Sequence, residues 1–325
     1  MVEKQAPPAA YADFEEEPRG GWLRTLVQFF AIPLLIVLFA VGLYLGIRVL
    51  VGGGPETAAD FVKLLRSDTI NRRWQAAYEL ASRLQGETVP PEFRDPGLVK
   101  ALGQALTDAR SEKEDPPRMA ILVLRLLGRL GDPGAIEAVR AAVEDEHPWI
   151  RSHAVLALAA LRDDASRPRI AALARDDDPG TRRAALEALA SMDQLEGAPY
   201  RLSDETRAIA LEHLGHTHED VRFTAALILA HAGDRANSLP MLMKMLDRSY
   251  LEGFEFDDRL GALSRYRLHS NVILAAIRGL VRLERGDDAA AMEALRRLTD
   301  PAVEGDVVVR DAAREALTTL AGNKD

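Results

Sequence analysis

Small and apolar residues return at helical spacing through most of the chain, and the pattern itself recurs about every 31 to 40 residues. In the copy IRSHAVLALAAL, residues Ala154, Leu158 and Leu161 lie on one face of a helix. Each such unit is too short to bury its apolar face alone, so neighbouring units must stack. Three further copies align with it: TRRAALEALASM (181–192), VRFTAALILAHA (221–232) and VRDAAREALTTL (309–320).

The pattern predicts an all-α fold, an α-α superhelix of about seven helix pairs over residues 57–325. Each aligned copy has Arg at its start, and Asp precedes several of them. An Asp at that place can cap the helix and pair with an Arg of a neighbouring repeat. The residues concerned are Arg151, Arg182, Arg222 and Arg310, with Asp178, Asp220 and Asp306.

The repeats resemble HEAT repeats, in particular the short bacterial kind known as PBS-lyase HEAT-like repeats. The resemblance rests on GRLGDPGAIEAVRAAVEDEHPWIRSHAVLALAAL and DVRFTAALILAHAGD, and it extends over Thr57 to Ala321. It implies an α-α superhelix with a binding role.

The N-terminal part has a different pattern. Between Arg24 and Arg48 lie 23 uncharged residues, which as a helix extend ~34 Å against a hydrocarbon core of ~30 Å. Residues 1–21 form an acidic tail that we expect to be disordered, 22–50 a retained transmembrane helix, and 51–56 a Gly-rich linker. A cleavable signal peptide fits less well, because the preceding region is acidic and no cleavage motif follows.

This segment predicts a single-pass protein of the cell membrane. Positive charges near the span weakly favour a cytoplasmic solenoid, whereas a signal anchor commonly places the large domain outside, so the side stays open. Gly42 and Gly46 form a GxxxG spacing that could join two copies as a homodimer.

The largest departure from the repeat is an insertion at 248–269. Aromatic residues and Arg dominate interface hot spots, which makes the insertion a candidate partner-binding site. The alternative is a loop that packs on the solenoid itself. The candidate residues are Tyr250, Phe254, Phe256, Arg259, Arg265 and Tyr266.

Catalytic chemistry has little support. The chain has no Cys, which excludes thiolate ligands and Cys nucleophiles, and its net charge of −9 disfavours nucleic acid as a partner. His213, His216 and His218 could ligate a metal, but His near a helix end also caps carbonyls. The HEAT-like enzyme deoxyhypusine hydroxylase uses several His-Glu pairs, and this chain has one, His218-Glu219. We therefore expect no catalytic site, no cofactor and no metal.

The sequence predicts a membrane-tethered scaffold or adaptor that binds another protein, with a membrane complex as a candidate partner. The alternative is a HEAT-like lyase or another protein that handles a small molecule or chromophore. The repeat alone does not carry that activity.

Overall fold

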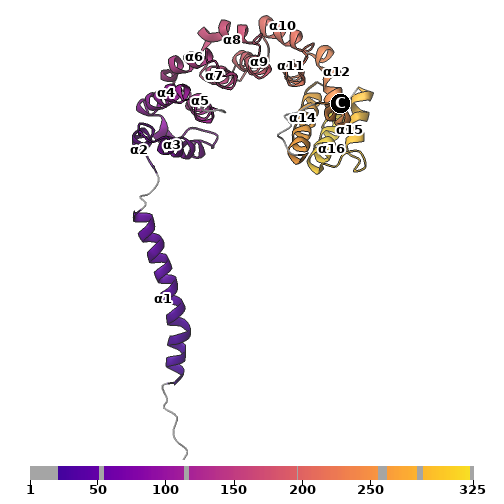
Figure 1. Ribbon diagram of the computed structural model, residues 1–325. Helices are drawn as coiled ribbons and strands as arrows, with labels where there is room; N and C mark the ends of the chain where they lie inside the picture. The colour runs from indigo at the N-terminus through magenta and orange to yellow at the C-terminus, as the bar shows by residue number, and fades with distance from the viewer. Residues whose placement is uncertain are drawn as a thin grey trace, which may run out of the picture. The chain divides into compact units, whose positions relative to one another are not determined.

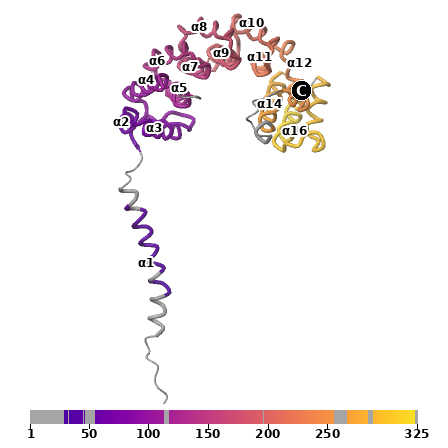
Figure 2. The backbone as a smooth tube through the Cα atoms, in the orientation of Figure 1, coloured from indigo at the N-terminus to yellow at the C-terminus, as the bar shows by residue number. Residues whose placement is uncertain are grey.

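The structure is a computed structural model, and it describes residues 21–50, 55–112, 117–195, 197–254, 262–283 and 288–322. The chain divides into two units, Met1–Glu56 and Thr57–Asp325 (Figures 1 and 2). No strand occurs within these ranges, and the all-α solenoid that the repeat predicts is confirmed. The first unit contains helix α1, Gly21–Leu50.

Helix α1 contains the segment that the sequence predicts to be transmembrane. In the part of the chain that the structure describes, no helix is long and apolar enough to cross a membrane. On this finding the prediction of a single-pass transmembrane protein located in the cell membrane is wrong.

The second unit is a succession of helix pairs, and Figure 1 shows two rows within it. The outer row contains α2 (Ala58–Leu65), α4 (Pro96–Ser111), α6 (Ile136–Val143), α8 (Arg167–Leu173) and α10 (Asp204–His213). The inner row contains α3 (Ile70–Arg83), α5 (Arg118–Leu130), α7 (Pro148–Ala160), α9 (Pro179–Asp193) and α11 (Glu219–His231).

The C-terminal part of this unit is less regular. It contains α12 (Arg235–Met245), the short α13 (Arg248–Glu252), the long α14 (Ala262–Leu283), α15 (Ala289–Leu298) and α16 (Val307–Gly322). Short 3-10 turns precede α4, α6 and α8, at Pro91–Phe93, Pro133–Ala135 and Asp164–Ser166.

Local chemistry sets where the helices begin. Asp178 caps α9 by accepting the Thr181 N–H at 2.6 Å, and Pro179 occupies the first helical position, where its missing N–H costs nothing. Asp95 caps α4 in the same way through the Leu98 N–H at 2.9 Å. Helix α5 ends at Gly131, whose φ of 67° is the left-handed conformation that glycine adopts without strain.

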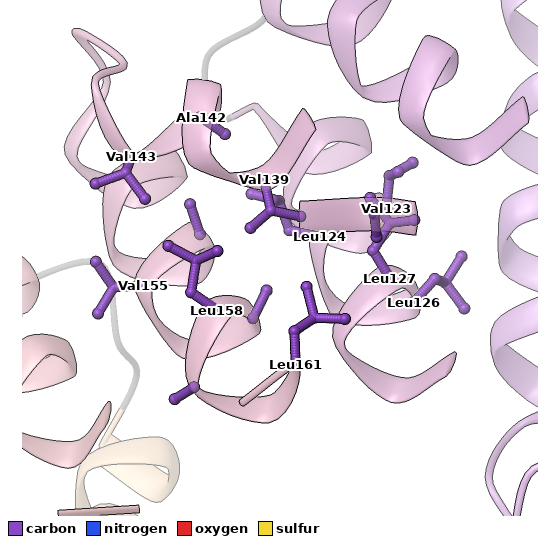
Figure 3. Packing of buried hydrophobic residues seen from close by; sticks show 14 of the residues in the cluster. Val123, Leu124, Leu126, Leu127, Val139, Ala142, Val143, Val155, Leu158 and Leu161 are labelled. Atoms are coloured by element: carbon purple, nitrogen blue, oxygen red, sulfur yellow. The ribbon is translucent and has the colours of Figure 1, made fainter. Parts of the chain in front are cut away.

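The core lies between the two rows of helices. Figure 3 shows its packing where α5, α6 and α7 meet: Leu124, Leu127, Val139 and Leu158 are all buried there. Full burial of one such side chain contributes ~1.5 to 3 kcal/mol before its entropic cost. Because Ala and Gly share these helix faces, the inner helices approach closely, and a Cβ on Gly128 would lie 3.2 Å from the Ala157 Cα.

Candidate functional site

A groove of about 840 Å³ lies over the inner helices α3, α5 and α7, and we call it the inner groove. It exists because small residues form its floor. These small residues are Ala81, Gly128, Ala157 and Ala160, which leave a hollow between longer neighbours. The remaining lining residues are Tyr78, Ser82, Leu84, Gln85, Leu122, Leu124, Arg125, Leu126, Arg129, His153 and Leu156.

The rim of the inner groove is polar and exposed. The Tyr78 side chain is 71% exposed, and Arg125 stands on the same face of α5 as Leu122. His153 is tied to its own helix, since its Nδ1 lies 2.8 Å from the Trp149 carbonyl oxygen. An apolar floor with a few polar groups at the rim is the composition of a binding surface.

Arg129 holds the end of α3 beside the inner groove. Its guanidinium donates to the Leu84 carbonyl at 3.2 Å and also to the Gly86 carbonyl. These carbonyls lie just past the last turn of α3, where cations complement the helix dipole. Arg129 therefore has a structural role, and Arg125 is the cation that faces outward.

The insertion packs against the solenoid at its three described candidate residues. The Tyr250 and Phe254 rings meet edge to face at 4.8 Å, and Phe254 meets Phe223 of α11 at 6.1 Å. The Arg248 guanidinium lies 4.3 Å from the centre of the Tyr266 ring. These internal contacts fit the self-packing alternative.

The structure does not describe the side chains of the other three candidate residues. Phe256 and Arg259 lie outside the described residues, and Arg265 lies in α14 at a position whose side chain is not described. The partner site at the insertion stays a prediction.

A buried ion pair explains why the insertion lies where it does. Arg248, at the start of α13, donates to both carboxylate oxygens of Glu304 at 3.1 and 2.8 Å. The Glu304 side chain is 1% exposed and that of Arg248 is 14% exposed. The Tyr266 hydroxyl donates to the same carboxylate at 3.5 Å. The insertion is thus joined to the loop before α16, a contact that sequence reasoning missed.

The histidine cluster lies between α10 and α11. The rings of His213 and His216 have centroids 6.2 Å apart, and those of His216 and His218 are 5.6 Å apart. Burial lowers the pKa of His213, and burial followed by the charge of Arg182 lowers that of His216. Among the described residues, no group of three or more His, Asp or Glu side chains is arranged to hold a metal ion.

Gly42 and Gly46 lie on α1, and a Cβ at either would meet nothing within 4 Å. The open space would accept a second helix, but no contact in the described residues involves these glycines. The homodimer stays a prediction.

The stacked helix pairs of the second unit form an α-solenoid. The family model described as HEAT repeats matches residues 99–190 and 169–252. The repeats across this stretch are therefore HEAT-like, as the resemblance implies. Among curated proteins, none matches the chain.

Several solved structures have a similar arrangement. One is the complex of CpcE and CpcF of phycocyanin lyase from Nostoc sp. PCC7120, with 19% identity, a TM-score of 0.48, and coverage of 83% of this chain and 97% of that one. Human deoxyhypusine hydroxylase in complex with glycerol has 15% identity, a TM-score of 0.35, and coverage of 82% and 96%. The archaeal HEAT-like repeats protein from Thermococcus onnurineus NA1 has 14% identity, a TM-score of 0.33, and coverage of 83% and 99%.

Proposed function

We propose that this protein is a HEAT-like scaffold that binds a partner protein in the inner groove. The observation that carries the proposal is the groove itself: about 840 Å³ of hollow on three adjacent inner helices, with an exposed Tyr78 at its rim. Tyrosine and arginine at the edge of an apolar hollow are the residue types that dominate binding energy in protein interfaces. The groove supports this role more strongly than the insertion, whose described aromatics already pack internally.

In-cell crosslinking tests the proposal. A photoreactive phenylalanine analogue at Tyr78 or at Leu122 places the reactive group in the inner groove. The matched control is the same analogue at Glu137, which is exposed on α6 of the outer row. The proposal predicts one recurring protein crosslinked from both groove positions and not from Glu137. The same set of proteins from all three positions, or none from the groove, would refute it.

A small molecule is the second candidate occupant, because the groove volume of about 840 Å³ falls within the ~300 to 1,000 Å³ of ligand sites. This corresponds to the lyase or chromophore-handling alternative. Absorption spectra and native mass spectrometry of the purified full chain decide between the two. A bound pigment or other small molecule that is lost when Ala160→Trp fills the groove would favour this alternative.

A further inference from the structure

The inner groove is locally positive in a chain whose net charge is −9. Its charged lining residues are Arg125 and Arg129, and no Asp or Glu is among the residues that line it. Arg129 already donates to two backbone carbonyls. Arg125 is exposed on α5 and pairs with no carboxylate among the described residues. Among the described residues, Arg125 is therefore the guanidinium of the groove whose N–H donors are not engaged, and such a group pairs with carboxylates in a two-pronged geometry.

The backbone around the groove restricts the shape of the occupant. Most lining residues come from helices α3, α5 and α7, and Leu84 and Gln85 lie just past the end of α3. The carbonyls of Leu84 and Gly86, just past the end of α3, are taken by Arg129. An extended segment would need partners for its N–H and C=O groups along the whole groove, and the Leu and Ala side chains of the lining offer none. A helix satisfies its own backbone and can enter such a groove.

The floor and walls fit the apolar side of such a helix. Ala81, Ala157 and Ala160 leave room for large side chains, and Leu122 and Leu156 provide apolar walls. A helix that binds in a groove contacts it through apolar anchor side chains spaced three or four residues apart. Arg125 lies one turn from Leu122, so a carboxylate one turn from the anchors could reach it.

We propose that the occupant of the inner groove is an amphipathic helix of a partner protein that places an acidic side chain against Arg125. The inference rests on the proposed function and specifies its partner. Apolar anchors on the partner helix fill the hollow above the small residues of α5 and α7. The carboxylate sets the direction and register of the helix.

A displayed library tests this directly. Random 16-residue peptides are selected for binding to the immobilised full chain, with counter-selection against the full-chain variant Ala160→Trp, whose groove is filled. The inference predicts enriched sequences with an Asp or Glu one turn from apolar residues at helical spacing. Enrichment of basic, uncharged or proline-rich sequences, or no enrichment over the filled variant, would overturn it.

Charge reversal gives a second, independent readout. Arg125→Glu should weaken the selected acidic peptides about tenfold, and the same peptides with Glu replaced by Lys should regain binding. The control is Arg278→Glu, an exposed arginine of α14, which should leave the affinity unchanged. If crosslinking from Tyr78 and Leu122 finds a partner but Arg125→Glu has no effect, the scaffold function stands and the acidic helix is wrong.

Discussion

A side chain three residues before an inner or terminal helix joins one repeat to the next, and we call this place the bridging position. Asp176 fills it before α9, accepting from the Asp178 N–H at 2.9 Å and from Arg151 of α7 at 2.8 Å. Asp145 makes the equivalent contacts before α7 with the His147 N–H and Arg110. The carboxylate orders its own loop and holds the neighbouring helix at the same time.

His216 occupies the bridging position before α11, where its ring cannot accept both of the hydrogen bonds offered to it. The His218 N–H points at its Nδ1 at 3.1 Å and Arg182 points at its Nε2 at 2.8 Å. A neutral imidazole has a single acceptor nitrogen, so one of the two donors stays unpaired. We predict that His216→Asp raises the free energy of unfolding by about 1 kcal/mol, because a carboxylate accepts both bonds.

The matched control for that change is the reverse substitution in the preceding repeat. Asp176→His should lower the free energy of unfolding by about 1 to 2 kcal/mol. Urea titration of both variants measures the pair. A His216→Asp variant that is no more stable than the parent would contradict this account of the bridging position.

The histidines also give the fold a pH dependence. The pKa values of His213, His216 and His231 are lowered, in each case mainly by burial. The unfolded chain, with a histidine pKa near ~6.5, then binds protons before the folded chain does. The contribution of these histidines to the free energy of unfolding is therefore fully present above about pH 6.5, and it decreases as the pH falls below that value.

We predict that the urea midpoint decreases between pH 7.5 and pH 5.5, in a range where most carboxylates stay ionised. His213 is 2% exposed, so His213→Leu should remove part of this decrease. His153→Leu is the control, because His153 of α7 is only partly buried. A midpoint that is constant over the range would contradict the burial account.

At the scale of the element, the inner helices could be predicted from the sequence. The stripe Ala185, Leu189 and Met192 is buried on α9, as its spacing indicates. The inter-repeat contact was only partly predictable. Asp178 caps its helix as expected, but Asp176, two residues earlier, pairs with the neighbouring repeat. Sequence spacing identifies a capping residue because capping is a local contact. Which of two nearby Asp residues reaches the Arg of the neighbouring repeat depends on the path of the loop, and the sequence does not specify that path.

The start of α12 shows another limit of the pattern. A Pro ordinarily marks a first helical turn, which suggests a beginning near Leu239, but α12 starts at Arg235 and runs through Pro240. Asp234 supplies the earlier cap by accepting the Asn237 N–H at 3.3 Å. The inner groove was also not predictable, since a hollow depends on which small residues of three helices meet.

The insertion gives a prediction at this scale. Glu304→Ala would leave the partly buried Arg248 without its carboxylate, so we expect a loss of about 3 kcal/mol in the free energy of unfolding. The control is Arg314→Ala, which removes a pair with Asp311 whose side chains are 53% and 62% exposed, and should cost less than ~1 kcal/mol. Equal losses in the two variants, measured by chemical denaturation, would show that the insertion is not held by this pair.

At the scale of the whole molecule, the second unit is a stack of helix pairs that hold one another in place. Each helix pair contacts its neighbours in the chain, and the repeated caps and ion pairs fix one repeat against the next. Such an arrangement holds an extended surface in place. The inner groove is where that surface is hollowed between α3, α5 and α7.

A bulky side chain placed in the inner groove tests whether the partner binds there. Ala160→Trp puts a large side chain into the hollow from the exposed end of α7, and Ser191→Trp makes the same change at the equivalent place of α9, outside the groove lining. Affinity for the crosslinked partner is then measured for both full-chain variants, with helicity as a check of folding. The account predicts at least a tenfold loss for Ala160→Trp and little change for Ser191→Trp. Equal affinity of the two folded variants would contradict binding in the inner groove.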